Sequence, residues 1–96
     1  MDLLTLEHFS GCVNETFHAS LNEGEIDFVL VEARSIPPPP GNHVRAPFSL
    51  LFRNTSSFLF PQQTYRMHHG RVGDVGIFLV PVAREREGFL YQAIFN

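Results

Sequence analysis

The feature that most constrains the fold is the stretch of residues 47–82, in which apolar segments alternate with turn-forming ones. It contains three β-prone runs, at residues 48–53, 64–68 and 75–82. Short runs rich in branched and aromatic residues, bounded by proline, glycine and asparagine, are typical of strands joined by turns. The stretch therefore predicts an antiparallel meander, to which the rest of the chain adds strands and a cap.

Three further strands are predicted outside this stretch. They are residues 14–21, residues 25–35 after a turn at residues 22–24, and residues 89–95 after a charged turn at residues 83–88. Antiparallel order with mostly short connections is typical of all-β architectures. The fold class predicted is mainly all-β, with about six antiparallel strands in a small barrel or a sandwich. Gly76 is expected to mark a bulge in its strand.

One short helix is predicted near the N-terminus, over residues 5–11. Thr5 suits the helix start because its side chain can accept a hydrogen bond from a free N–H group. Glu7 lies in the first turn, where the helix dipole favours negative charge. Gly11 is expected to end the helix in the left-handed conformation. A helix this short is not stable alone, so it is expected to cover one end of the sheet.

The alternation of apolar and polar residues along the strands also predicts the core. Ten phenylalanines and no tryptophan make that core rich in phenylalanine. The residues on the apolar faces of the alternating runs, which we expect to be buried, are Phe28, Leu30, Phe48, Leu50, Phe52, Ile77, Leu79, Tyr91 and Phe95.

Length and charge exclude several classes of protein. Ninety-six residues suffice for a single barrel-like domain, residues 1–96, with one core. The net charge is −3 and the basic residues are scattered arginines, without the basic stripe of a nucleic-acid-binding protein. There is no signal-peptide pattern and no run of apolar residues long enough for a membrane span, so a cytoplasmic location is expected. The single cysteine, Cys12, excludes an intrachain disulfide and is expected to pack as a small hydrophobe.

The sequence contains no motif for catalysis, a cofactor or a metal ion. His68 and His69 would point to opposite faces of their strand, so they cannot both bind one ion. His18 and His43 could join one of them in space, but their spacing does not demand it. No nucleophile is accompanied by an oriented base. The sequence therefore predicts no catalytic residue, no cofactor and no metal-ligating residue.

Three polar residues are candidates for ligand binding. Arg53, Arg66 and His68 could converge at the mouth of a barrel and bind a carboxylate or a phosphate. In the other interpretation, the two arginines pair with Glu32 or Asp27 across the sheet.

Three apolar residues, Phe58, Leu59 and Phe60, are candidates for an interface. They lie in a connection that either folds back over an open end of the barrel or forms a contact patch for another protein. The proline run at residues 37–40 predicts an extended surface loop.

Association with another chain is expected. A barrel that does not close leaves unpaired strand edges, which invite pairing, and residues 75–82 and 89–95 carry no charge that would blunt such an edge. A homodimer or an obligate protein partner is therefore predicted, burying part of residues 58–60 or an edge strand. Neither nucleic acid nor a membrane is expected as a partner.

Five segments stand out together, at residues 3–9, 47–53, 63–69, 77–82 and 91–96. They resemble a family of small, uncharacterised bacterial proteins of about this length, a domain of unknown function. The resemblance covers nearly the whole chain and implies no catalytic motif. It further implies a genomic setting beside genes for phage-tail-collar or tail-fibre-like proteins.

These observations favour a non-catalytic interaction or assembly protein, accessory to a phage-tail-like system. The alternative is a small-molecule-binding protein or an enzyme that uses a pocket at the barrel mouth. A pocket with converging polar groups would favour the alternative, whereas a flat apolar patch would favour an assembly protein.

Overall fold

The computed structural model describes residues 4–22, 24–38, 40–41 and 46–96. One short helix is followed by six strands, as predicted. The elements are α1 (Leu6–Ser10), β1 (Thr16–Leu21), β2 (Gly24–Ser35), β3 (Phe48–Asn54), β4 (Gln63–His69), β5 (Gly73–Glu85) and β6 (Gly88–Phe95).

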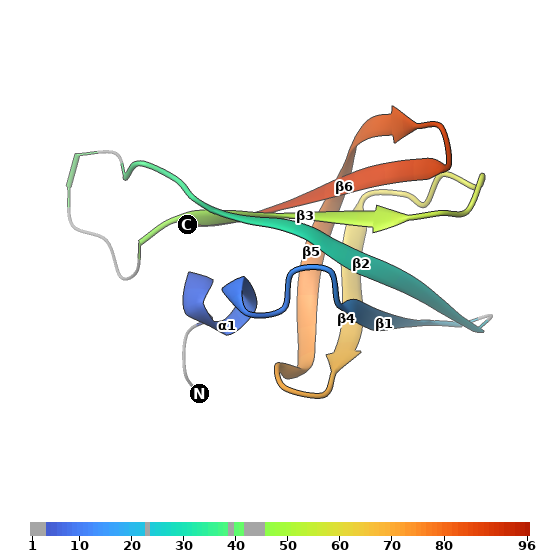
Figure 1. Ribbon diagram of the computed structural model, residues 1–96, viewed down its shortest axis with the longest axis horizontal. Coiled ribbons are helices and arrows are strands. Elements are labelled where there is room, and N and C mark those ends of the chain that lie inside the picture. The colour runs from blue at the N-terminus through green and yellow to red at the C-terminus, as the bar shows by residue number, and fades with distance from the viewer. Residues whose placement is uncertain (1–3, 23, 39, 42–45) are drawn as a thin grey trace.

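All six strands belong to one antiparallel sheet that closes on itself into a ring (Figure 1). The strand order is β1-β2-β3-β6-β5-β4. The meander predicted over residues 47–82 is therefore correct for β4 and β5 but wrong for β3, which pairs with β2 and β6 instead of β4. The ring closes where β1 pairs with β4, from His18 opposite His68 to Ser20 opposite Arg66. We call this contact the β1–β4 seam.

Closure of the ring answers one expectation in part. Residues 75–82 and 89–95 were expected to offer unpaired edges. In the structure β5 pairs with β4 over residues 73–79 and with β6 over residues 80–85, while β6 pairs with β3 along its length and with β5 only from Gly88 to Gln92. Both strands have a neighbour on each side, but each residue of β5 is paired on one side only, so closure shortens the expected edges and leaves part of them.

The sheet bends at two bulges, neither of which lies at Gly76. The bulges occur between Leu30 and Glu32 and between Pro81 and Ala83. Gly76 instead pairs regularly with Arg66. A Cβ atom at Gly76 would lie 3.3 Å from Cγ2 of Thr64, so the glycine makes room for that neighbouring side chain. The predicted bulge at Gly76 is therefore wrong.

The helix α1 begins as predicted and ends differently. The backbone N–H of Thr5 donates to Nδ1 of His8 (2.9 Å), a reciprocal cap in which histidine replaces the usual glutamate. Gly11 has φ −83°, so its predicted left-handed conformation is wrong. The chain continues as a turn over residues 11–14, and in this turn Asn14 adopts the left-handed conformation, with φ 72°. Among the described residues no helix combines the length and the apolar character needed to cross a membrane.

The interior of the ring is filled by aromatic and aliphatic side chains. Every predicted core residue except Phe95 is at most 1% exposed, and Phe95 is partly buried against the core. At one end Phe9 of α1 packs against Phe17, with 6.2 Å between ring centroids, so the helix covers that end as predicted. At the other end Phe60 meets the edge of Phe28, with 6.5 Å between centroids.

The predicted charged turn is shorter than expected, and a nearby asparagine belongs to the sheet. Asn54 ends β3 and is 8% exposed. Its amide donates to the carbonyl of Asp27 (2.8 Å) and accepts from the N–H of Ser56 (2.9 Å), which satisfies a buried polar group. In the charged hairpin only residues 86–87 form the turn. Gly88 is required there, because a Cβ atom would lie 2.1 Å from the carbonyl oxygen of Asn54.

The position of Phe52 makes it a test of the core. Its aromatic ring makes T-shaped contacts with those of Phe17 and Phe28, which are direct partners on β1 and β2. We expect Phe52→Ala to lower the free energy of unfolding by about 3–5 kcal/mol, since a large cavity would remain. The measurement is chemical denaturation of the purified chain. Phe78→Ala is the control, because Phe78 is 50% exposed and its truncation should cost far less. Equal losses in the two variants would contradict the assignment of faces.

Candidate functional site

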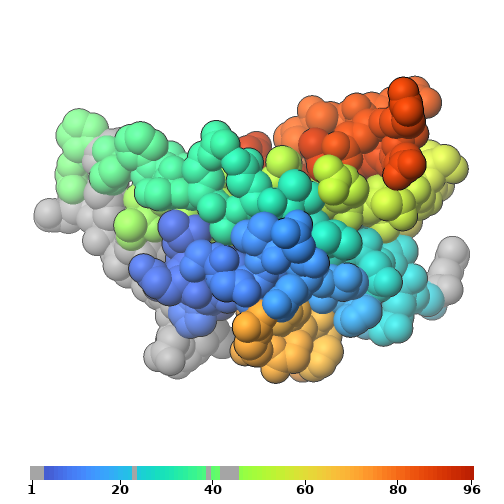
Figure 2. All heavy atoms as spheres, viewed as in Figure 1, coloured from blue at the N-terminus to red at the C-terminus, as the bar shows by residue number. Residues whose placement is uncertain are grey.

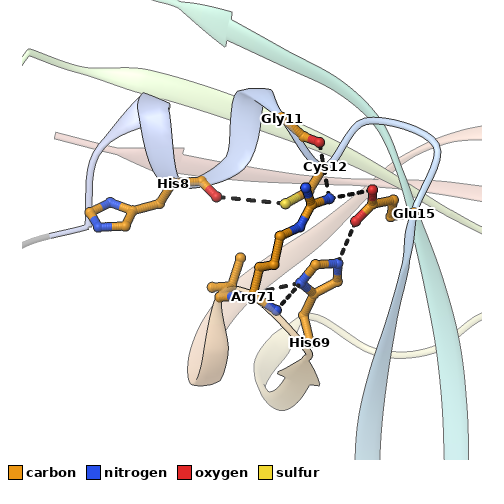
Figure 3. Close-up of polar contacts among 7 residues, drawn as sticks. His8, Gly11, Cys12, Glu15, His69 and Arg71 are labelled. Carbon is orange, nitrogen blue, oxygen red and sulfur yellow. Dashed lines mark hydrogen bonds and ion pairs between the residues drawn. The ribbon is translucent and has the colours of Figure 1, made fainter.

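A side-chain network ties the segment before β1 to the turn between β4 and β5 (Figure 3). Glu15 accepts a hydrogen bond from Nε2 of His69 (2.7 Å) and forms an ion pair with Arg71. Arg71 also donates to the carbonyl of Gly11 (3.2 Å). We call Glu15, His69 and Arg71 the Glu15 network. Figure 2 shows the blue atoms of the N-terminal segment lying directly against the orange atoms of the β4–β5 turn.

The Glu15 network continues the β1–β4 seam beyond its backbone pairing. The register that sets His18 opposite His68 would bring Phe17 opposite His69 and Glu15 opposite Arg71. The side chains meet in that order, because Phe17 stacks on His69 with 4.4 Å between ring centroids and Glu15 pairs with Arg71. Side-chain contacts therefore extend a short backbone ladder.

The buried ring of His69 is held in one tautomer. Its Nδ1 accepts from the backbone N–H groups of Arg71 (3.1 Å) and Val72 (3.3 Å). A nitrogen that accepts two N–H groups does not carry the proton of a neutral imidazole. The proton is therefore on Nε2, which donates it to Glu15.

This tautomer bears on whether the cluster could bind a metal ion. Cys12, Glu15 and His69 offer sulfur, oxygen and nitrogen atoms that all lie within 4.8 Å of one another, and these are ligand types that zinc prefers. However, Nε2 of His69 carries a proton, and both oxygens of Glu15 already accept hydrogen bonds. The thiol of Cys12 donates to the carbonyl of His8 (3.7 Å). The contacts favour a structural tie over a metal centre.

The same contacts argue against nucleophilic catalysis by Cys12. A catalytic thiol needs an adjacent base with a free acceptor nitrogen. Nδ1 of His69 is occupied by two backbone N–H groups and Nε2 by Glu15. Cys12 is 3% exposed within the core, as expected for a small hydrophobe.

Electrostatics within the Glu15 network follow from its geometry. The hydrogen bond from Arg71, and then that from His69, lowers the pKa of the Glu15 carboxyl below its usual value of 4.5. The carboxylate in turn raises the pKa of Arg71. Both shifts favour the charged forms, so the ion pair persists at neutral pH.

Arg53 is paired with a residue that the sequence interpretation did not name. Its guanidinium grips Glu85 with Nε–Oε1 2.5 Å and Nη2–Oε2 3.0 Å, a forked arrangement. The expected partners are engaged elsewhere, since Glu32 pairs with Arg34 and Asp27 pairs with His18. The expectation that Glu32 or Asp27 would hold Arg53 is therefore wrong.

Arg66 and His68 lie together on the outward face of β4. With Ser20 and Asp74 they line an open depression of about 200 Å³. Arg53 lines a different depression, of about 250 Å³, with Glu85 and the hairpin turn that follows it. The structure thus brings Arg66 and His68 together and keeps Arg53 apart from them.

Four polar residues form a row across the outside of β5, β4, β1 and β2. Successive partners in the sheet register are Asp74, His68, His18 and Asp27. Nδ1 of His68 lies 2.7 Å from Oδ1 of Asp74, and Nδ1 of His18 lies 2.7 Å from Oδ1 of Asp27. We call these four residues the histidine row.

The adjacent histidines have separate environments. His68 is exposed in this row while His69 is buried, so the prediction that the two point to opposite faces is confirmed. His43 and part of the proline run at residues 37–40 lie outside the described residues.

The three candidate interface residues have different surroundings. Phe60 is partly buried against the core, which fits the interpretation that the connection covers one end of the sheet. Phe58 and Leu59 are 61% and 51% exposed, which fits the interpretation of a contact patch. The connection between β3 and β4 therefore both covers one end of the sheet and exposes two apolar side chains.

Acid should weaken the Glu15 network. Because the pKa of Glu15 is lower in the folded chain, its stabilisation is present above about pH 4.5 and is lost as pH falls through the folded pKa. We expect the difference in unfolding free energy between the wild type and Glu15→Gln to shrink between about pH 6 and about pH 3. Denaturant titrations at several pH values measure this difference. A difference that stays constant with pH would contradict the role given to the ion pair with Arg71.

A protein-family model matches nearly the whole chain. The model of a family described as a domain of unknown function (DUF6916) matches residues 4–95. No curated protein and no solved structure matches the sequence. Because the matched region contains the helix and all six strands, the chain belongs to the DUF6916 family of unknown function.

Proposed function

We propose that the protein is a non-catalytic assembly protein that associates with a second copy of itself through Phe58 and Leu59. The observation that carries this proposal is a tightly held loop with two adjacent large apolar side chains at its tip. Phe58 is 61% and Leu59 51% exposed, although the neighbouring Phe60 is packed against the core.

Hydrogen bonds hold this loop at both ends. At its start the N–H of Ser56 donates to Asn54 (2.9 Å) and the N–H of Phe58 donates to the hydroxyl of Ser56 (3.0 Å). Near its end the N–H of Phe60 donates to the hydroxyl of Tyr91 (3.0 Å). The aromatic ring of Phe58 also packs on that of Phe60, with 4.9 Å between centroids. A loop held in this way loses little conformational entropy on binding.

A second copy of the chain would supply a matching apolar patch. Burying a phenylalanine or leucine side chain contributes at most about 1.5–3 kcal/mol, so one tip supplies at most about 3–6 kcal/mol. Micromolar binding requires about 8 kcal/mol. A two-fold interface uses the same patch from both chains, so it buries both apolar side chains twice.

Closure of the ring favours a side-chain interface. Strand addition needs an unpaired edge, and β5 and β6 each have a neighbouring strand on both sides over part of their length, which leaves only short unpaired stretches. The described depressions lined by Arg53 and by Arg66 are open and are 250 Å³ or smaller, below the usual size of small-molecule pockets. Exposed apolar side chains on a preorganised loop are typical of interaction sites.

The proposal includes a biological setting. We infer an accessory role in the cytoplasmic assembly of a phage-tail-like system, because the resemblance described for the sequence implies a genomic setting beside tail-collar or tail-fibre-like genes. Co-expression with the tail-fibre-like protein of the same locus, followed by purification of the complex, tests this setting. Separate elution of the two proteins would contradict it and leave the self-association test unaffected.

Self-association is tested by charge substitution at the loop tip. We expect the wild type to be a dimer at high micromolar concentration and the double variant Phe58→Asp with Leu59→Asp to be a monomer. Asp side chains at the centre of an apolar interface would be buried without a partner. Light scattering coupled to size-exclusion chromatography measures the mass.

The matched control is Phe78→Asp, because Phe78 is similarly exposed at 50% but lies on β5. We expect this variant to remain a dimer, and circular dichroism should show that all variants are folded. A wild-type monomer at high micromolar concentration, or a dimer that persists in the double variant, would contradict the proposal.

A further inference from the structure

We propose that His18 and His68 bind a divalent transition-metal ion such as zinc or nickel on the outer face of the β1–β4 seam. This inference is independent of the assembly function. It also departs from the expectation, drawn from the sequence, that the chain contains no metal-ligating residue.

The sheet register places the two imidazoles side by side. His18 and His68 are direct partners across neighbouring antiparallel strands, and both are exposed on the outer face. Directly opposite residues in such a pair have Cβ atoms about 4.5–5.5 Å apart. That separation allows one nitrogen of each ring to reach a shared ion.

Each imidazole is oriented by its own carboxylate. Asp27 lies 2.7 Å from Nδ1 of His18, and Asp74 lies 2.7 Å from Nδ1 of His68. A neutral imidazole that donates Nδ1–H to a carboxylate keeps the lone pair of Nε2 for a ligand, which is the arrangement that most metal-binding histidines share. Within the described part of the chain, neither Nε2 has a hydrogen-bond partner in the structure.

The surrounding charges favour a cation. Asp27 and Asp74 flank the pair, and Glu25 lies opposite Ser20 in the next row of the same face. Arg66 on β4 is the other cross-strand partner of Ser20, and it is the basic residue beside Glu25 and Ser20. Among the described residues nearby, three carboxylates stand against one guanidinium. The local charge is therefore negative and offsets part of the positive charge of a divalent ion.

The histidine row differs from the buried cluster of Cys12, Glu15 and His69. In that cluster Nδ1 of His69 accepts hydrogen bonds from two backbone N–H groups, so the ring proton is on Nε2. This proton is donated to Glu15, and neither ring nitrogen is left to bind an ion. In the histidine row the carboxylates occupy Nδ1, and Nε2 is left for the ion. The structure therefore assigns the ion to His18 and His68.

An ion at this position would join the two strands that close the ring. Their backbone pairing covers only three positions, from His18 opposite His68 to Ser20 opposite Arg66. A ligand that binds only the folded state stabilises it by mass action. Metal binding should therefore raise the melting temperature. The ion pairs of His18 with Asp27 and of His68 with Asp74 would not by themselves produce such a metal-dependent increase.

Calorimetric titration of the full chain with nickel chloride and with zinc chloride tests the proposal. We expect one ion per chain, a higher melting temperature in its presence, and loss of both effects in His18→Ala and in His68→Ala. Asp27→Asn and Asp74→Asn should weaken binding by about 10–100-fold, because each removes an orienting carboxylate. Unchanged affinity in both Asp variants would overturn the positioning role of the carboxylates.

Two control variants distinguish this site from other residues that could bind a metal ion. His8→Gln keeps a residue suited to the helix cap and should bind normally. Cys12→Ser alters the buried cluster and should also bind normally. The proposal is overturned if the wild type binds no ion at millimolar metal, if either histidine variant binds as the wild type does, or if Cys12→Ser abolishes binding.

Discussion

Pairing of β1 with β4 closes the sheet, and the rest of the structure depends on this contact. The backbone ladder there covers three positions, whereas β4 with β5 and β3 with β6 each pair over seven. Side chains lengthen the short ladder, because Phe17 stacks on His69 and Glu15 pairs with Arg71 in the same register. The seam is thus held partly by polar side chains, and it is the place where acid would weaken the ring.

Closure determines what the interior and the edges can do. Aromatic side chains fill the ring, and Phe9 and Phe60 cover its two ends. Because β5 and β6 each have a neighbouring strand on both sides over part of their length, only short stretches of them are left for strand addition. Both proposals therefore use side chains displayed on the outer surface.

Both proposed surface sites are positioned by the ring beneath them. The hydroxyl of Tyr91, whose ring is buried, fixes the loop that carries Phe58 and Leu59. The register of the β1–β4 seam fixes the distance between His18 and His68. In each case a rigid element orients the exposed groups before any partner or ion binds, which lowers the entropic cost of binding.

The sequence by itself determined the strands, the short helix and the buried faces, because alternation of apolar residues is a local property with a period of two. It also placed His68 and His69 on opposite faces. Only the tertiary structure decided the ring closure, the pairing of Arg53 with Glu85 and the tie between Glu15 and His69, which are 54 residues apart. The register between distant strands depends on side-chain packing and bulges across the whole sheet, so no local pattern in the chain specifies which polar residues meet.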